Sequence, residues 1–290
     1  MGAPSASGRP ATFGPLSDRL FLRFSRYIQE ELGIKMPPAK RTMLQARLQK
    51  RLRKLGMRDF EQYHEFVFSP EGRRTELPNL IDAVTTNKTD FFREAQHFTY
   101  LTTRVLPELI REHGAGLERP AHFWSAGCST GEEPYTLAMV LSDYRMQHPR
   151  FAFSILGTDI SGEVLRTAAA GIYAHEKVAP VPMPLRKRYL LKSRDSKKDL
   201  VRVVSELPGR VEFRRVNFMS RDLGVRRTMD VVFCRNVLIY FDRDNQEAVL
   251  GRICRHLRTG GYLFTGHSET LNGLDVPLVQ MASTVYRKRG

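Results

Sequence analysis

The chain contains 290 residues, of which 41% are apolar and 27% are charged, proportions typical of soluble globular proteins. No apolar run approaches the roughly 18 residues needed to cross a bilayer, and the three cysteines are widely spaced, which argues against a membrane span, a disulfide framework and a cysteine zinc site. Lys and Arg outnumber Asp and Glu by 46 to 31, and the net charge of +15 predicts attraction to nucleic acid, an anionic membrane surface or an acidic protein. Because free cysteines suit a reducing compartment, we expect a cytoplasmic protein.

The N-terminal part of the chain carries helix signals. Residues 1–16 are rich in Ser, Gly, Pro and Ala, and we expect them to form a disordered leader. In residues 17–85, Ser17 is a candidate N-cap of a helix that ends at Gly33, and Asp59 is a candidate N-cap further along. These signals predict a small all-helical N-terminal domain.

A second helix of this domain is expected over residues 40–56, and it is strongly basic. Its leucines recur at helical spacing, at Leu44, Leu48, Leu52 and Leu55. Nine Lys and Arg residues and no acidic residue lie between Lys35 and Arg58. Two interpretations remain open, a solvated helix face and a docking surface for an acidic partner.

From about residue 94 short strands alternate with longer helices. Strands are predicted over residues 121–126, 153–158, 230–234 and 262–265, and helices over 98–109, 132–146, 162–170 and 243–257, the last ending at Gly260-Gly261. Such alternation is typical of a doubly wound, Rossmann-like α/β sheet that is covered on both faces. Residues 86–290 are therefore predicted to form this domain, with its ligand site at the carboxyl ends of the strands.

Residues 176–209 interrupt the alternation. They contain several prolines, a basic run and a short predicted strand over residues 200–204. We expect a small subdomain inserted in the α/β domain.

Small and acidic residues follow the first two predicted strands. Gly127–Gly131 is a loop of small residues between a strand and a helix, and it lacks the Lys and the glycine spacing of a phosphate-binding loop. Glu132 and Glu133 then begin the helix, where they suit a ligand with a positive end, although acidic residues also stabilise a helix start. Asp159 ends the next strand, as does the acidic residue that binds ribose hydroxyls in nucleoside sites, and it could equally cap the next helix. Together they predict an adenosine site without a pyrophosphate.

Three longer segments carry a family resemblance. They are Thr85–Glu94 (TTNKTDFFRE), Ser129–Tyr135 (STGEEPY) and Cys234–Asp242 (CRNVLIYFD), joined by the Gly171–Tyr173 turn and His267–Glu269. In this order the chain resembles the chemotaxis receptor methyltransferases of the CheR type over residues 17–288. The resemblance implies an N-terminal helical domain, an S-adenosylmethionine-dependent methyltransferase domain and a small antiparallel β subdomain inserted at residues 176–209.

The same resemblance implies a reaction and its residues. The enzyme would methylate glutamate side chains on the helical bundles of chemoreceptors and release S-adenosylhomocysteine. The cofactor-binding residues implied by the matching positions are Asn87, Thr89, Arg93, Glu133, Asp159, Asn217, Phe218, Arg235 and Asn236. Arg93 and Tyr240 would lie nearest the reacting carboxylate, and no metal site is implied. A glutamate carboxylate with a pKa near 4.3 is already the nucleophile at neutral pH, so the site needs orientation and no general base.

Two other functions are compatible with part of the sequence. A nucleic-acid methyltransferase would suit the charge, but none of the three cysteines follows proline and no Pro-Pro-aromatic loop follows the strand at residues 230–234. A non-catalytic relative that only binds receptors is the other alternative. The resemblance implies that the partner is the acidic methylation helices of chemoreceptors, bound through the basic helix 40–56. We expect the enzyme to be a monomer that neither binds nucleic acid nor inserts into a membrane. Some relatives are tethered to a receptor peptide through a glycine-bearing hairpin of the β subdomain, and Lys192–Asp199 here has no glycine.

Overall fold

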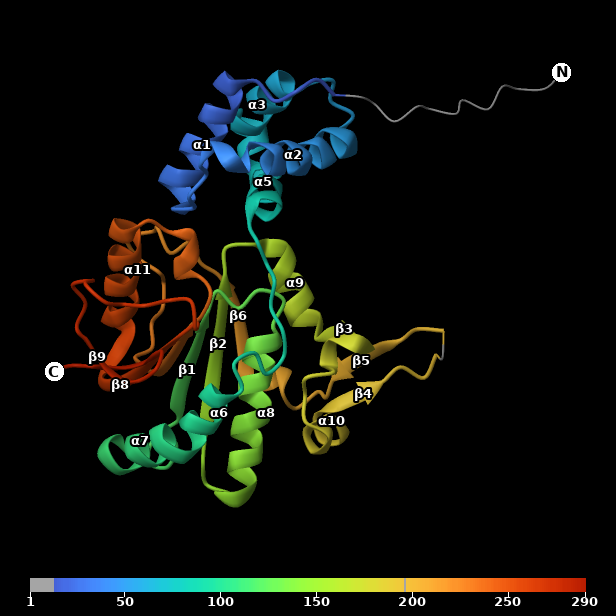
Figure 1. Ribbon diagram of the computed structural model, residues 1–290. Coiled ribbons are helices and arrows are strands. Elements are labelled where there is room, and N and C mark those ends of the chain that lie inside the picture. The colour runs from blue at the N-terminus through green and yellow to red at the C-terminus, as the bar shows by residue number, and fades with distance from the viewer. Residues whose placement is uncertain (1–12, 196) are drawn as a thin grey trace. The chain divides into compact units, whose positions relative to one another are not determined.

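The computed structural model describes residues 13–195 and 197–290 and divides into two compact units, Met1–Thr85 and Thr86–Gly290 (Figure 1). Most of the expected leader, residues 1–12, lies outside the described residues. Its last residue differs from the expectation: Leu16 is fully buried, and its N–H donates to Gln45 Oε1 over 2.9 Å. Leu16 is therefore part of the packed N-terminal unit.

The N-terminal unit is all-helical, as predicted. Ser17 and Gly33 cap its first helix, Ser17 by accepting a bond from the Leu20 N–H and Gly33 through a left-handed φ of 70°. Its helices are α1 Asp18–Leu32, α2 Arg41–Leu55 after a 3-10 turn at Pro38–Lys40, α3 Phe60–Phe68, α4 Pro70–Thr75 and α5 Leu77–Val84. The predicted leucine stripe of α2 is buried at its first three positions, but Leu55 is 37% exposed because it lies in the last turn.

A buried carboxylate ties α2 to the rest of this unit. Glu76 is 2% exposed and accepts bonds from Arg51 Nε and Nη2 at 2.8 and 2.7 Å and from the Tyr63 hydroxyl at 2.9 Å. Arg47 Nη1 donates to the carbonyls of Val84 and Thr85 at 2.7 and 2.9 Å. Some basic residues of α2 therefore stabilise the N-terminal unit through bonds within it.

The second unit is built on a seven-stranded sheet, which confirms the predicted doubly wound α/β fold. Its strands are β1 Ala121–Ala126, β2 Phe153–Asp159, β6 Val211–Arg215, β7 Met229–Cys234, β8 Leu257–Thr265, β9 Leu278–Ala282 and β10 Val285–Lys288, in the order β6-β2-β1-β7-β8-β10-β9. The first five strands of that order pair in parallel, and β10 is antiparallel to both of its neighbours. The carboxyl ends of β1, β2, β6, β7 and β8 therefore meet at one edge of the sheet.

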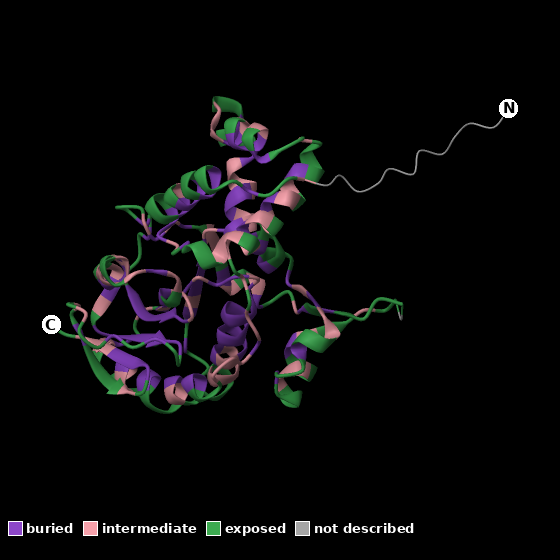
Figure 2. Cartoon of the chain, turned by 45° about the horizontal axis from the view of Figure 1, so that its top comes forward, coloured by how far each residue is buried: buried purple, intermediate pink, exposed green. Residues whose placement is uncertain are grey.

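Apolar side chains fill both faces of this sheet. Phe123 belongs to the core under α8 (Glu132–Gln147), while the adjacent Trp124 belongs to the core under α11 (Arg243–His256). Figure 2 shows the buried residues gathered along the strands and the helices that face them. The remaining helices are α6 Gln96–Tyr100, a π-helical turn at Leu101–Val105, α7 Leu106–His113 and α9 Gly162–Ala170. None of the helices in the described residues is long and apolar enough to span a membrane.

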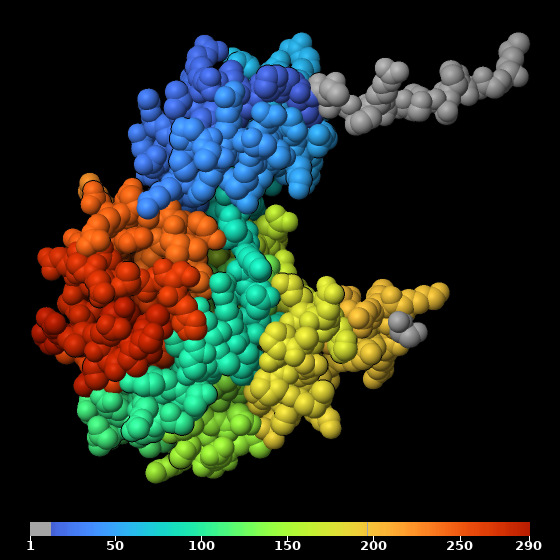
Figure 3. Space-filling view, in the orientation of Figure 1, coloured from blue at the N-terminus to red at the C-terminus, as the bar shows by residue number. Residues whose placement is uncertain are grey.

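A separate three-stranded antiparallel sheet forms the inserted subdomain, which projects from the second unit in Figure 3. Its strands are β3 Ile172–Ala174, β4 Leu190–Lys192 and β5 Leu200–Val203, in the order β3-β5-β4, with a 3-10 turn at His175–Val178 and α10 at Met183–Tyr189. β3 lies before the predicted start of the insertion at residue 176, because the Gly171–Tyr173 turn leads directly into the sheet.

The C-terminal elements differ most from the prediction. The α11 helix ends at His256, and Gly260-Gly261 lie inside β8 instead of ending that helix. Gly261 is needed there because a Cβ atom would lie 2.8 Å from the Asp230 and Arg258 carbonyl oxygens. Strands β6, β9 and β10 were not predicted, nor were the 3-10 turns at Pro208–Arg210 and Leu238–Tyr240.

Candidate active site

The loop Gly127–Gly131 connects β1 to α8 and packs closely against its neighbours. Gly127 and Gly131 have left-handed φ angles of 82° and 96°. A Cβ atom on Gly127 would lie 2.4 Å from Val237 Cγ2, and one on Gly131 would lie 2.8 Å from Ala168 Cβ. Both positions therefore require glycine, which lets the loop pack closely against Val237 and Ala168.

Asp159 is buried at the end of β2 and orders the loops on both sides of it. Its Oδ2 accepts the Ser129 N–H at 2.9 Å and its Oδ1 accepts the Ser161 N–H at 3.0 Å. The N-cap of α9 is Ser161, whose hydroxyl accepts the Val164 N–H. Asp159 is thus not the helix cap that was the alternative explanation for it.

The two glutamates at the start of α8 are both buried and have different partners. Glu133 Oε1 accepts the Ser125 hydroxyl and its Oε2 accepts Arg235 Nε, each at 2.6 Å. Glu132 accepts the Thr130 hydroxyl at 2.6 Å and lies 4.0 Å from Lys177 Nζ. Burial raises the pKa of Glu132, although the Thr130 bond lowers it.

Arg235 is 3% exposed in its side chain and joins three segments of the site. Besides Glu133, its guanidinium reaches the Arg93 carbonyl at 2.6 Å through Nη1, and that same nitrogen lies 3.4 Å from Glu94 Oε2 and 3.3 Å from His97 Nδ1. The guanidinium also lies over the rings of Phe98 and Phe233. Arg235 therefore connects the end of β7 and the start of α8 to the segment that carries Arg93.

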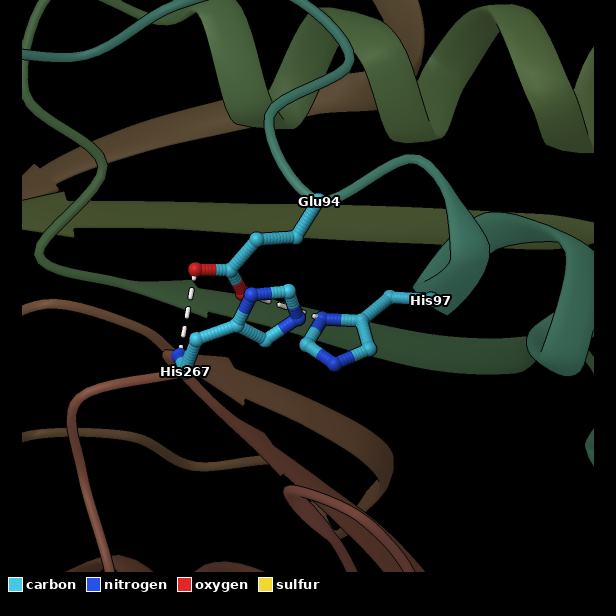
Figure 4. A group of neighbouring side chains, drawn as sticks. All are labelled: Glu94, His97 and His267. Atoms are coloured by element: carbon cyan, nitrogen blue, oxygen red, sulfur yellow. Dashed lines mark hydrogen bonds and ion pairs between the residues drawn. The ribbon is translucent and has the colours of Figure 1, made fainter.

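Glu94, His97 and His267 form a cluster beside Arg235 (Figure 4). Their composition suits a metal ion, but their polar atoms have protein partners: Glu94 Oε1 accepts the His267 N–H at 3.1 Å, and His267 Nε2 meets Gln96. His97 and Glu94 both face the Arg235 cation as well. The cluster is better described as a hydrogen-bonded support of the site than as a metal centre.

The tautomer of His97 follows from its neighbours. The Thr284 hydroxyl donates to the Ser283 carbonyl at 2.7 Å, so it accepts a bond from His97 Nε2 at 2.8 Å. Nε2 then carries the proton and Nδ1 accepts from Arg235. Burial, followed by the nearby Arg235 charge, lowers the pKa of His97 to about 4, so the ring is neutral at pH 7.

The segment that carries Asn87, Thr89 and Arg93 lies against the loop after β1. The Ser129 hydroxyl donates to the Asn87 carbonyl at 2.8 Å, and Lys177 Nζ lies 3.4 Å from the Thr89 carbonyl. Phe92, Glu94 and Ser129 adopt left-handed φ angles of 54°, 55° and 49°. Arg93 is half-buried, and its Nη1 makes a long 3.4 Å bond to the Lys88 carbonyl.

The other predicted site residues follow two further strands of the sheet, β6 and β7. After β6, the Val216 N–H donates to the Asp159 carbonyl at 2.9 Å, and this bond places Asn217 and Phe218 beside the end of β2. Phe218 is buried, with its ring 6.3 Å from that of Trp124. After β7, Asn236 has a left-handed φ of 59°, and Tyr240 ends the 3-10 turn, half-buried. Within the described residues no hydrogen bond joins Tyr240 to Arg93, although both segments lie at the same edge of the sheet.

Sequence reasoning missed several buried polar residues that organise the site. Ser125 donates a hydrogen bond to Glu133, His97 accepts one from Arg235, and Glu269 accepts one from the Asn236 N–H in the segment after β7. A polar residue inside an apolar strand was the available signal for Ser125. For His97 and Glu269 the partners are far along the chain, and only the fold reveals them.

The geometry suits a cofactor with a positive centre and a ribose. Buried carboxylates lie near the ends of β1 and β2, and the described loop Gly127–Gly131 contains no lysine that would bind phosphates. These features fit S-adenosylmethionine better than a dinucleotide.

Comparison with known proteins agrees with this geometry. Residues 19–85 match the family model described as CheR methyltransferase, all-alpha domain, and residues 87–287 match CheR methyltransferase, SAM binding domain. The chain is 38% identical to a chemotaxis protein methyltransferase of Klebsiella aerogenes, over 97% of this chain and 93% of that protein. It is 37% identical to the Escherichia coli K12 protein of that name, covering 93% and 91%, and 36% identical to the Borreliella burgdorferi one, covering 87% and 88%. The chain therefore belongs to the CheR family of S-adenosylmethionine-dependent chemotaxis methyltransferases.

Proposed function

We propose that this enzyme transfers a methyl group from S-adenosylmethionine to glutamate side chains of chemoreceptors, forming methyl esters that serve sensory adaptation. The observation that carries the proposal is the bond network that joins the cofactor edge to the Arg93 segment through Arg235 and Ser129. The names of the relatives given above support the chemotactic role. We infer that the enzyme works in the cytoplasm as a monomer.

The cofactor is assigned to residues at the strand ends. Asp159 would accept the ribose hydroxyls, and Asn217 with Phe218 would flank the adenine. The methionine end would lie near Glu133 and Arg235, with contributions from Asn87, Thr89, Arg93 and Asn236. Supporting this assignment, Asp159 and Glu133 are 7% and 8% exposed, and backbone N–H groups and side chains already fix their orientation.

When bound, S-adenosylmethionine supplies an electrophilic methyl group on a sulfonium. The residues of the chain then only have to place an ionised glutamate in line with it, because a carboxylate with a pKa near 4.3 needs no base at neutral pH. Arg93 is assigned the orientation of that carboxylate, and its long 3.4 Å bond to the Lys88 carbonyl leaves the guanidinium able to turn toward a substrate. Tyr240 is assigned a second contact to the carboxylate.

The partner surface is assigned to α2 and its flanks. Of the nine basic residues there, Arg41, Arg47 and Arg51 have partners inside the N-terminal unit. The exposed members of the run are Lys35, Lys50, Arg53, Lys54 and Arg58. Their charge complements the acidic methylation helices of a receptor, so association should weaken as salt screens it.

The function is tested by transfer of radiolabelled methyl groups to membranes that contain chemoreceptors, followed by mild alkali. Label on a receptor-sized band that is released as methanol is expected, with Arg93→Ala reducing turnover more than cofactor binding. Alkali-stable label on RNA or DNA would overturn the substrate and leave the cofactor in place.

The docking surface is tested separately with charge reversals. Lys50→Glu with Lys54→Glu should raise the KM for receptor and flatten its salt dependence. The control, Arg150→Glu with Arg166→Glu, makes the same change in net charge at exposed positions of the second unit. Equal effects of the two pairs would show that only overall charge matters.

A further inference from the structure

Glu269 is a buried carboxylate in the loop that follows β8, and it binds four backbone N–H groups. The residue is 5% exposed. Its Oε2 accepts the N–H groups of Asn236 and Gly266, each at 2.7 Å. Its Oε1 accepts those of Leu238 at 2.7 Å and Ile239 at 3.4 Å. Burial raises the pKa of Glu269, and the N–H bonds offset only part of that rise. Four donors facing its two oxygens favour the ionised form.

Three of these four N–H groups belong to the segment after β7. Leu238 and Ile239 begin the 3-10 turn that ends at Tyr240, so Glu269 caps the turn that presents this tyrosine. Asn236 lies just before it with a left-handed φ of 59°, a conformation that asparagine tolerates better than most residues but that still has to be held in place. The bond from the Asn236 N–H to Glu269 holds it in place.

The same loop also supports the segment of Arg93. The His267 N–H donates to Glu94 Oε1 at 3.1 Å, and Glu94 directly follows Arg93. Gly266 is packed so closely that a Cβ atom would lie 2.6 Å from Asn236 Nδ2. The loop Gly266–Glu269 is therefore in contact with both segments to which the reacting substrate is assigned.

We propose that Glu269 is a positioning residue, which sets the backbone that presents Asn236 to the cofactor and Tyr240 to the substrate. The inference rests on the proposed function for the role of Tyr240, and on the S-adenosylmethionine site for that of Asn236. Glu269 itself is assigned no contact with the cofactor or with the substrate. Its loss should therefore lower turnover and cofactor affinity through the geometry of the segment after β7.

A matched control exists at the other end of the same strand. Asp230 is fully buried near the start of β7 and accepts bonds from Arg119 Nη1 at 2.8 Å, Arg258 Nε at 3.0 Å and the His122 N–H at 2.9 Å. Asp230→Asn removes a buried, bonded carboxylate far along the strand from the site. It should lower stability and leave the chemistry alone.

The experiment compares full-length Glu269→Gln and Asp230→Asn for melting temperature, for S-adenosylhomocysteine affinity by calorimetry, and for kcat and KM with receptor membranes. In Glu269→Gln an amide NH₂ faces backbone N–H groups, so the segment must shift. A shift of about 1 Å can cost up to about a hundredfold in rate, and we expect kcat to fall at least about tenfold and the cofactor affinity several-fold. Asp230→Asn should keep kcat and cofactor affinity within about twofold of the wild-type values, even if its melting temperature falls as much as that of Glu269→Gln.

Each result decides the question. Glu269→Gln with kcat and affinity as close to wild type as the control would show that Glu269 only stabilises the fold. If the wild-type enzyme binds S-adenosylhomocysteine but labels no receptor, the proposed substrate fails while the affinity measurement still tests Glu269. If Glu269→Gln does not fold, Gly266→Ala replaces it, because its methyl group must displace Asn236; unchanged kcat and affinity in that variant would overturn the proposal.

Discussion

Removing the Arg235 guanidinium should destabilise the second unit strongly. Arg235→Met keeps an unbranched, largely apolar stem but leaves Glu133, which is 8% exposed, with the Ser125 hydroxyl as its remaining side-chain partner among the described residues. It also removes the 2.6 Å bond to the Arg93 carbonyl. A buried ion that loses its counter-ion costs about 3–5 kcal/mol, because neither water nor another charge replaces the lost partner.

That cost can be measured as a change in melting temperature. For a unit of this size, 1 kcal/mol corresponds to about 2–4 °C, so Arg235→Met should melt roughly 6–20 °C below wild type. The second change, Glu133→Gln, removes the stranded charge and keeps an acceptor for Ser125. The double variant Arg235→Met with Glu133→Gln should therefore be more stable than Arg235→Met alone, by about 1–3 kcal/mol.

Thermal unfolding followed by circular dichroism on the wild type, both single variants and the double variant gives the coupling energy. If the two single effects add within about 0.5 kcal/mol, the two side chains do not stabilise each other and the reasoning is refuted. A melting point of Arg235→Met within a few degrees of wild type would refute the estimated cost as well.

Three further outcomes are expected. Glu76→Gln should lower the stability of the N-terminal unit by about 3 kcal/mol because Arg51 loses its buried partner, while the exposed Glu71→Gln should leave the melting curve unchanged. Because the folded-state pKa of His97 is lowered to about 4, the unfolded chain binds more protons, so stability present above pH 6.5 should be lost as the pH falls toward 4, by on the order of 3 kcal/mol. In His97→Gln, a plot of the denaturation midpoint against pH should be flatter between pH 6.5 and 4 than in the wild type. Equal slopes in the two proteins would contradict the lowered pKa of His97. Asp159→Asn should weaken S-adenosylhomocysteine binding by about tenfold or more in calorimetry, and an unchanged affinity would remove its assigned contact to ribose.

Local sequence signals predicted the elements whose stabilisation is local. Ser17 and Asp59 cap helices as expected, and the parallel strands over residues 121–126 and 153–158 follow from short, mainly apolar segments. Strands β9 and β10 were missed because they are short, and their pairing partners define them more than their own residues do. Gly260-Gly261 predicts a helix end because glycine commonly ends helices, whereas in the structure the pair lies within β8, where Gly261 permits close backbone approach.

In the candidate site, the residues at the strand ends could be placed from the sequence, but their hydrogen-bond partners could not. Because parallel strands end at one edge, Glu133 and Asp159 could be placed together from the chain order alone. The partners of Arg235 and Glu269 could not be placed, since each bond joins residues more than thirty positions apart or depends on a loop conformation. Such bonds arise from tertiary packing, and no periodicity in the sequence encodes them.

The left-handed backbone at Phe92, Glu94, Ser129 and Asn236 has a consequence for laboratory evolution. Each of these residues adopts a conformation that costs about 1 kcal/mol or more for any residue but glycine. A selection for heat resistance alone would therefore favour glycine wherever this strain outweighs the side-chain bonds that glycine would lose, while a selection for turnover would retain the larger side chains. Variants that tolerate heat best should thus accumulate their changes in the segments around the site, and be the slowest catalysts.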